Sequence, residues 1–157
     1  MAHLSIHVVK RLPLISVVIP VKNGENYLES AINSVIDQDY ENFELIIGIN
    51  PSTDGTQNIA NGYRNHPKIK IVEFKDSVNM PENFNRSALF ASGKYLKFLC
   101  HDDVLGTNAL KEFFITAENN PEIGMFSCYE GFINSKRSPR TQGAFGKNLI
   151  KSSNLSL

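Results

Sequence analysis

The stretch LISVVIP, residues Leu14–Pro20, decides the fold of this chain. It is an uninterrupted apolar run, rich in β-branched side chains, that ends in proline. Strands of a parallel sheet have this composition because helices cover both faces of such a sheet. The run therefore predicts the first central strand of an α/β domain.

Strand and helix patterns alternate after this run. Apolar residues recur at i, i+3, i+4, i+7 and i+8 over Leu28–Ile36, which is one stripe of a helix. FELIIGI, Phe43–Ile49, repeats the buried-strand pattern, and capping side chains precede a predicted helix over Thr56–Asn65. The alternation predicts a Rossmann-like α/β fold, with a mostly parallel sheet flanked by helices. The other predicted elements are a strand at Ile69–Phe74, a helix opened by Pro81 and closed by Gly93, a strand at Tyr95–Leu99, a helix at Asn108–Asn119 and a strand from Met125 to about Phe132.

Composition limits the function classes. Lysine plus arginine and aspartate plus glutamate number 16 each, so no net field attracts nucleic acid or an anionic membrane. Cys100 and Cys128 match neither a disulfide framework nor a zinc ribbon, which predicts reduced thiols and a cytoplasmic location. No apolar stretch approaches the roughly 20 residues that span a bilayer, so any membrane association would be peripheral, through partner machinery.

The chain divides into three segments by composition. Residues 1–13 carry basic and histidine side chains without a signal-peptide core, and we interpret them as a leader. Residues 14–134 contain the predicted strands and helices and suit one domain. Residues 135–157 begin with a polar, basic, turn-forming run, which predicts a loop or tail.

Polar residues follow three of the predicted strands. Ligands of open α/β sheets bind beyond the carboxyl ends of the strands, so Pro20–Gly24, Asn50–Thr56 and His101–Leu105 should converge on one edge. No G-x-G-x-x-G follows the first strand, and no Walker-type G-K-S/T loop is present. These absences argue against dinucleotide cofactors and P-loop chemistry.

Asp102 and Asp103 form the candidate metal site. Adjacent carboxylates repel each other unless a cation lies beside them, and hard oxygen ligands suit Mg²⁺ or Mn²⁺. A solvated pair, or an N-cap for the next helix, stays open as an alternative. We interpret His101 as a surface or capping group and do not expect Cys100 to be a metal ligand.

The segment after the second strand offers a candidate base contact. Asn50 carries an amide that exchanges paired hydrogen bonds, either with the edge of a nucleobase or with the backbone of a turn. The stretch Ser52–Thr56 predicts a turn and a helix start, with Asp54 favoured by the helix dipole.

Taken in order, these segments resemble family 2 glycosyltransferases of the GT-A fold over about Leu14–Asn134. The resemblance implies the nucleotide-sugar-binding N-terminal part of such an enzyme, apparently truncated, with 135–157 as the start of an incomplete acceptor half. It also implies a site for a nucleoside-diphosphate sugar and a divalent metal, Mg²⁺ or Mn²⁺. The implied nucleotide-binding residues are Pro20, Val21, Asn23, Asn50 and Asp102, and the implied metal ligands are Asp103 and Asp102.

The chain departs from the family pattern at three positions. Ile49 and Asn50 stand where the family usually has two acidic residues, which leaves guanosine or thymidine donors open besides uridine. Cys100 stands where an aspartate often precedes the acidic pair. The family implies inverting transfer to a glycan or lipid-linked acceptor in bacterial surface polysaccharide synthesis. The general base of the family lies beyond the metal motif. No later acidic residue matches a catalytic-base motif, so we assign no catalytic residue; Glu130, near the end of a predicted strand, is the least poor candidate.

Two rival functions remain open. A non-catalytic, degenerate fragment would keep the fold and bind a nucleotide, dimerise or regulate, and dimerisation would use an apolar patch at Phe132, Phe145, Leu149 and Ile150. A nucleotidyltransferase would need a basic phosphate-binding loop after the first strand. Lys22 and Gly24 are the only residues of that segment that match such a loop.

Overall fold

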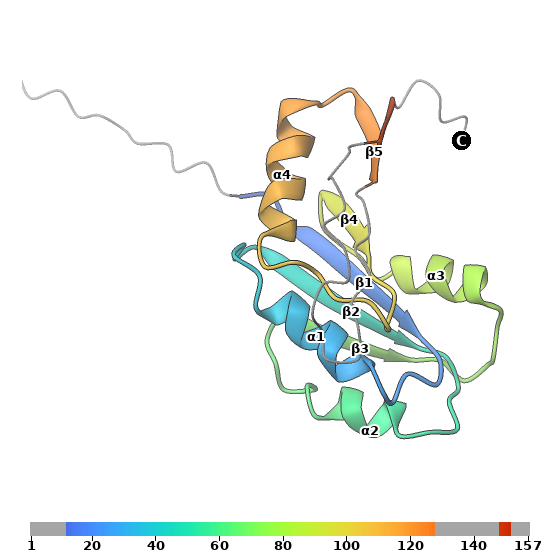
Figure 1. Ribbon diagram of the computed structural model, residues 1–157. Coiled ribbons are helices and arrows are strands. Elements are labelled where there is room, and N and C mark those ends of the chain that lie inside the picture. The colour runs from blue at the N-terminus through green and yellow to red at the C-terminus, as the bar shows by residue number, and fades with distance from the viewer. Residues whose placement is uncertain (1–11, 128–147, 152–157) are drawn as a thin grey trace, which may run out of the picture. The chain divides into compact units, whose positions relative to one another are not determined.

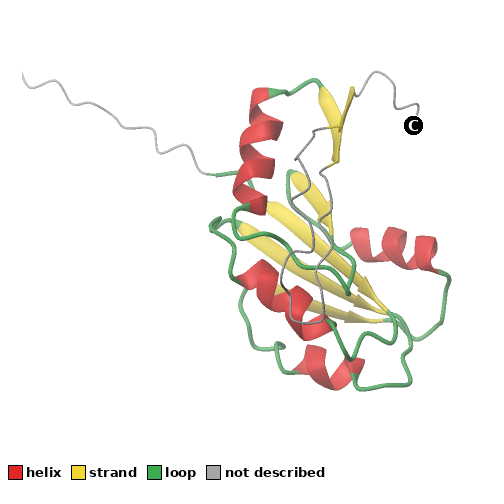
Figure 2. Ribbon diagram, in the orientation of Figure 1, coloured by secondary structure: helices red, strands yellow, loops and turns green. Residues whose placement is uncertain are grey.

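The computed structural model describes residues 12–127 and 148–151. The chain divides into two compact units, Met1–Lys111 and Glu112–Leu157. The first unit contains a four-stranded parallel sheet in the order β3-β2-β1-β4 (Figures 1 and 2), which confirms the predicted sheet type. Its strands are β1 (Ile15–Val21), β2 (Phe43–Ile49), β3 (Ile69–Glu73) and β4 (Tyr95–Phe98).

The two inner strands, β1 and β2, form the core of this sheet. Every residue of β1 is buried, and in β2 only Glu44 is partly exposed. Val17 pairs with Leu45 and Val18 with Ile46. Each fully buried aliphatic side chain of this size stabilises a fold by roughly 1.5–3 kcal/mol. The central position predicted for LISVVIP is confirmed, because β1 lies between β2 and β4.

Three helices cover the sheet of the first unit. They are α1 (Leu28–Ile36), α2 (Thr56–Asn61) and α3 (Met80–Ala88). α1 and α2 contact each other on one side of the sheet, whereas α3 packs against β1 and β2 from the other side (Figure 1). α1 buries the predicted apolar stripe. α2 ends earlier than predicted, because i to i+3 hydrogen bonds replace the α-helical pattern over residues 62–64.

The strand order reverses between β1 and β4. The chain moves outward from β1 to β2 and β3, and α3 then returns it to the other side of β1. Right-handed crossovers place α3 on the face opposite to α1 and α2. At such a reversal the loops of two neighbouring strands turn to opposite faces, and open α/β sheets bind ligands there. The reversal therefore favours the residues that follow β1 and β4 as the ligand-binding position.

The second unit begins at Glu112, within α4 (Ala109–Asn119). β5 (Ile123–Ser127) and β6 (Asn148–Lys151) pair antiparallel. β6 lies within the segment that we predicted to be a loop or tail, so that prediction is wrong for these four residues. So short a strand depends on pairing with its partner, β5, and its own sequence pattern does not reveal it. β5 begins earlier than predicted, and its predicted end at Phe132 lies outside the described residues. None of the described helices is long and apolar enough to span a bilayer.

Glu44 ties the start of β4 to the inner strands at the amino edge of the sheet. Its carboxylate accepts hydrogen bonds from Ser16 Oγ at 2.5 Å and from Ser92 N and Oγ at 2.7 and 2.8 Å. Burial alone would raise the pKa of Glu44, but these hydrogen bonds outweigh burial, and the pKa lies below its ordinary value of 4.5. A Cβ on Gly93 would lie 2.7 Å from the carbonyl oxygen of Leu14, so only glycine allows this approach.

We expect Glu44→Gln to weaken the pH dependence of folding. A carboxyl whose pKa is lowered by folding stabilises the native state above its unfolded pKa, and this contribution is lost as the pH falls through the folded pKa. The free-energy difference between wild type and variant should therefore be largest near about pH 7 and shrink below about pH 4. Urea denaturation across this range measures it. Glu41→Gln, at an exposed glutamate, should follow wild type, and parallel curves for all three proteins would contradict the assignment.

Candidate functional site

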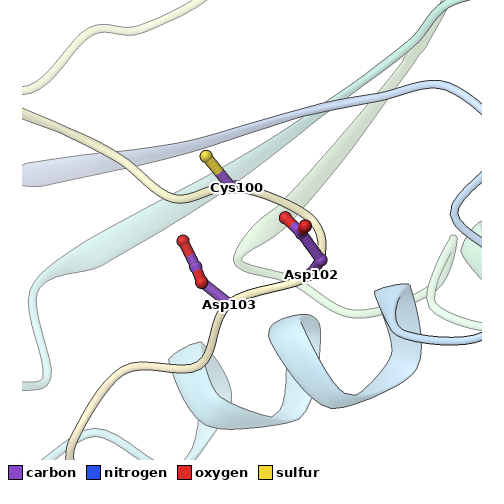
Figure 3. Close-up of side chains that lie close together, drawn as sticks. All are labelled: Cys100, Asp102 and Asp103. Atoms are coloured by element: carbon purple, nitrogen blue, oxygen red, sulfur yellow. The ribbon is translucent and has the colours of Figure 1, made fainter. Parts of the chain in front are cut away.

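A four-residue turn carries the acidic pair directly after β4. Leu99 N donates to Val18 O at 3.0 Å, and Asp103 N donates to Cys100 O at 3.1 Å, which closes the turn. Cys100, Asp102 and Asp103 are exposed, and their donor atoms all lie within 4.8 Å of one another. Figure 3 shows the three side chains pointing to the same side of the turn. The turn thus presents two carboxylates and a thiol to one region.

The end of α1 holds the chain that leaves this turn. Ser34 Oγ accepts from Leu105 N at 3.0 Å. Gln38 Nε2 donates to Gly106 O at 2.7 Å, and Gln38 Oε1 accepts from Leu110 N at 2.9 Å. The turn is therefore fixed by β4 on one side and by α1 on the other. The sequence analysis did not predict these roles of Ser34 and Gln38. The only sign of them in the sequence is that one polar residue lies within the predicted helix and the other just after it.

His101 packs against the loop that follows β1. A Cβ on Gly24 would lie 2.7 Å from His101 Cδ2 and 2.6 Å from Val21 Cγ2. The imidazole is half-buried, and a residue larger than glycine at position 24 would displace it or Val21. This contact joins the loop after β1 to the acidic turn. The ring thereby acts as a spacer between the two loops at the reversal of strand order.

The stretch Ser52–Thr56 clamps the loop after β1. Gly24 N donates to Thr56 Oγ1 at 2.7 Å, and Glu25 N donates to Asp54 Oδ2 at 3.0 Å. In return, Gly55 N donates to Glu25 Oε2 at 3.1 Å. The hydrogen bond from the Thr56 hydroxyl is the main cause that lowers the pKa of Asp54. The predicted turn and helix start are confirmed, and these side chains also hold the neighbouring loop.

Asn23 completes this clamp in an unusual backbone conformation. Its φ angle is +52°, in the left-handed region that asparagine tolerates better than most residues. Asn23 N donates to Ser52 Oγ at 3.1 Å, and Asn23 Oδ1 accepts from Thr53 N at 2.9 Å. Pro20 and Val21, which precede it, are buried. The loop after β1 can therefore offer a ligand its backbone and the exposed Asn23, but not the side chains of Pro20 and Val21.

The amide of Asn50 is engaged by the protein itself. Asn50 is only 2% exposed, and its Nδ2 donates to Val78 O at 2.7 Å. Its Oδ1 accepts from Val78 N at 3.1 Å and from Arg86 Nη2 at 2.9 Å. The paired donor and acceptor pattern expected toward a nucleobase is thus satisfied by the backbone of Val78. Arg86 was not singled out in the sequence, because its partners come from three separate segments.

A hollow lies beside Asn50 at the ends of β2 and β3. Its volume is about 400 Å³, within the range of roughly 300–1,000 Å³ typical of small-molecule sites. The guanidinium carbon of Arg86 lies 3.7 Å from the ring centroid of Phe74, which is part of its wall. The lining residues are Ile49, Pro51, Ser52, Gln57, Glu73, Phe74 and Lys75.

All six predicted site residues lie at the carboxyl edge of the sheet. Asp102 and Asp103 follow β4, Pro20, Val21 and Asn23 end or follow β1, and Asn50 follows β2. These three strands are neighbours in the order β2-β1-β4, so the sheet aligns the segments side by side. The donors of the turn fit a divalent cation, because carboxylate oxygens can hold such an ion while water and phosphate complete its shell.

Comparison with known families accounts for this arrangement. Residues 16–155 match the family model described as glycosyl transferase family 2. The first curated relatives are described as glycosyltransferases, and the chain spans 37% or less of their length. Chondroitin synthase of Pasteurella multocida is 34% identical over 110 residues, which are 67% of this chain and 11% of that protein.

Solved structures share the fold. S. aureus TarS in complex with UDP-GlcNAc matches 68% of this chain and 32% of its own, with a TM-score of 0.64 and 27% identity. Mannosyltransferase PcManGT from Pyrobaculum calidifontis, in complex with GDP-Man and Mn²⁺, matches 77% of this chain and 36% of its own. Its TM-score is 0.68 at 20% identity, which is a likeness of fold alone. The predicted GT-A fold class is confirmed by these likenesses.

Thr56→Val should destabilise the first unit through the loop clamp. The substitution keeps the branched shape but removes the hydroxyl that accepts from the buried Gly24 N–H. An unsatisfied buried donor costs about 1–3 kcal/mol, so the free energy of unfolding in urea should fall by that amount. Thr53→Val, at an exposed threonine of the same stretch, should change it by less than about 0.5 kcal/mol. Equal effects of the two substitutions would refute the clamp.

Proposed function

Because the chain belongs to glycosyl transferase family 2, we propose that its first unit binds a nucleoside-diphosphate sugar together with a divalent metal. The observation that carries this proposal is the position of the exposed Asp102–Asp103 turn beside the loop after β1, where the strand order reverses. In the complete protein, the sugar would be transferred with inversion to a glycan or lipid-linked acceptor. The name of the Pasteurella relative, a chondroitin synthase, supports a polysaccharide product.

We assign the metal to the acidic turn. Asp103 would coordinate the ion at the diphosphate, and Asp102 would coordinate it or hold the ribose. Mg²⁺ and Mn²⁺ both suit these oxygen donors, and the Mn²⁺ and GDP-Man in the PcManGT complex support a divalent ion. A bound ion would neutralise charge on the departing nucleoside diphosphate. The residues around the turn keep it in place for that role, since β4 and α1 hold its two ends.

The nucleoside would lie along the loops after β1 and β2. Pro20 and Val21 would contribute through their backbone, and Asn23 through its exposed side chain. Asn50 would act indirectly, through the hydrogen bonds by which it holds Val78 and Arg86 in place. UDP-GlcNAc in TarS and GDP-Man in PcManGT represent two base classes, so uridine, guanosine and thymidine donors all require testing.

The remaining roles belong to the whole protein. The chain spans about a third or less of its first curated relatives, and the general base would come from the second half of the complete fold. Glu130 lies outside the described residues, and we assign it no role. We propose a cytoplasmic location with peripheral contact to membrane machinery.

A non-catalytic, dimerising fragment is the alternative. Phe132 and Phe145 of its contact patch lie outside the described residues, whereas Leu149 and Ile150 fall in β6. The two functions differ in one measurable property, because only the transferase reading requires metal-dependent binding of a nucleotide.

Calorimetric titration with UDP, GDP and dTDP, each with and without Mn²⁺, tests this property. We expect one nucleotide to bind in a metal-dependent way, and Asp103→Ala to weaken that binding by more than about tenfold, equivalent to about 1.4 kcal/mol. Asp37→Ala, at an exposed aspartate after α1, should bind as wild type does. Absence of binding by all three nucleotides would reject the donor site and favour the interaction fragment.

A further inference from the structure

We propose that the thiol of Cys100 is a third ligand of the divalent metal, which shifts the preference of the site from Mg²⁺ toward borderline metals such as Mn²⁺, Co²⁺ and Zn²⁺. This inference rests on the proposed function, because it concerns the same ion. It revises the expectation from the sequence, in which Cys100 was not a ligand. The structure assigns the thiol a place that the sequence pattern alone did not reveal.

The geometry of the turn carries the assignment. Cys100 and Asp103 occupy the first and last positions of a hydrogen-bonded four-residue turn, which brings positions i and i+3 close together. Asp102 is the third residue of the same turn. Sγ and the carboxylate oxygens lie within 4.8 Å of one another, and all three residues are exposed (Figure 3). No long-range movement of the chain is needed for them to meet one ion.

The donor distances are close to those of a real coordination shell. Zinc lies about 2.3 Å from sulfur and about 2.0–2.2 Å from oxygen, so sulfur and oxygen on one tetrahedral ion are separated by roughly 3.5–3.7 Å. The donor atoms of this turn lie within 4.8 Å of one another, so side-chain rotations that close the widest separation by about 1 Å bring them to that distance. Among the described residues, no other group of three histidine, cysteine or acidic side chains converges as closely. A bound ion can therefore be assigned to this turn by substitution.

The chemistry of sulfur gives the metal preference. A thiolate is a soft ligand that suits zinc and other transition metals, whereas Mg²⁺ prefers carboxylate, carbonyl and water oxygens. Binding requires the thiolate form, so the thiol proton leaves to the solvent when the ion binds. The carboxylates of Asp102 and Asp103 are hard ligands, so a thiolate beside them changes which ions the turn holds best.

Cobalt absorption spectroscopy on the untagged chain tests the ligand directly, without any need for transfer activity. Co²⁺ bound to a thiolate shows a sulfur-to-cobalt charge-transfer band in the near ultraviolet, which oxygen ligands do not produce. We expect this band in wild type and in Cys128→Ser, which removes the only other cysteine of the chain. Cys100→Ser should abolish the band while Co²⁺ still binds at the carboxylates.

Affinities measured by calorimetry provide the second readout. Cys100→Ser should weaken Zn²⁺ and Co²⁺ by at least about tenfold and change Mg²⁺ by less than about threefold, because only the soft ligand is lost. Unfolding in urea should be unchanged in the absence of metal, which separates a ligand from a structural role.

The outcomes distinguish this inference from the function on which it rests. Co²⁺ binding that Asp103→Ala abolishes, without a charge-transfer band, would overturn the role of Cys100 and leave the metal site standing. A band that persists in Cys100→Ser but disappears in Cys128→Ser would place the thiol elsewhere and also overturn it. No binding of Co²⁺, Mn²⁺ or Mg²⁺ in the presence of nucleotide would overturn the metal site itself.

Discussion

The carboxyl edge of the sheet depends on one constraint, which is that backbone N–H and C=O groups leaving a strand need new hydrogen-bond partners. Short polar side chains supply these partners in all three loops. Thr56 accepts a hydrogen bond from Gly24 N in the loop after β1, and Asn50 pairs with the backbone of Val78. Gln38 donates to Gly106 O and accepts from Leu110 N in the segment after the acidic turn. Each of these side chains is buried. If one of them is removed, water cannot reach the backbone groups that it bonded, and those groups stay without a hydrogen-bond partner. The loops are therefore ordered by the protein and not by a ligand.

This order gives the acidic turn its surroundings. The clamp around Gly24 fixes the loop after β1, the ring of His101 packs on that glycine, and the turn continues from His101 into the two aspartates. Asp102 and Asp103 remain exposed while their neighbours are held. Binding groups that are preorganised in this way lose less conformational entropy when a ligand arrives. The arrangement suits a site at which ligands can be exchanged while the surrounding loops stay in place.

The sequence predicted those features whose cause is local. Apolar runs predicted β1 and β2, and the acidic pair stood out because a strand ends just before it. The contacts of Gln38 and Arg86 were not predictable, because their partners lie 68 and 36 residues away along the chain. Asn50 was expected to offer its amide to a nucleobase or to a turn, and no local signal shows that the backbone of Val78 pairs with it. β6 was missed for the same reason, since its pairing with β5 creates the strand.

The turn from Cys100 to Asp103 brings three donor atoms together within four consecutive residues. Such a set does not require the folded sheet, so part of it survives when the chain unfolds. A metal bound there as we propose would associate with the denatured chain as well as with the native one, and the denatured affinity offsets the native stabilisation. Melting-temperature shifts would then understate how tightly the native protein holds its ion. The same locality means that a short peptide with this sequence would carry all three donor groups of the turn, without the contacts from Ser34 and Gln38 that hold the segment after it.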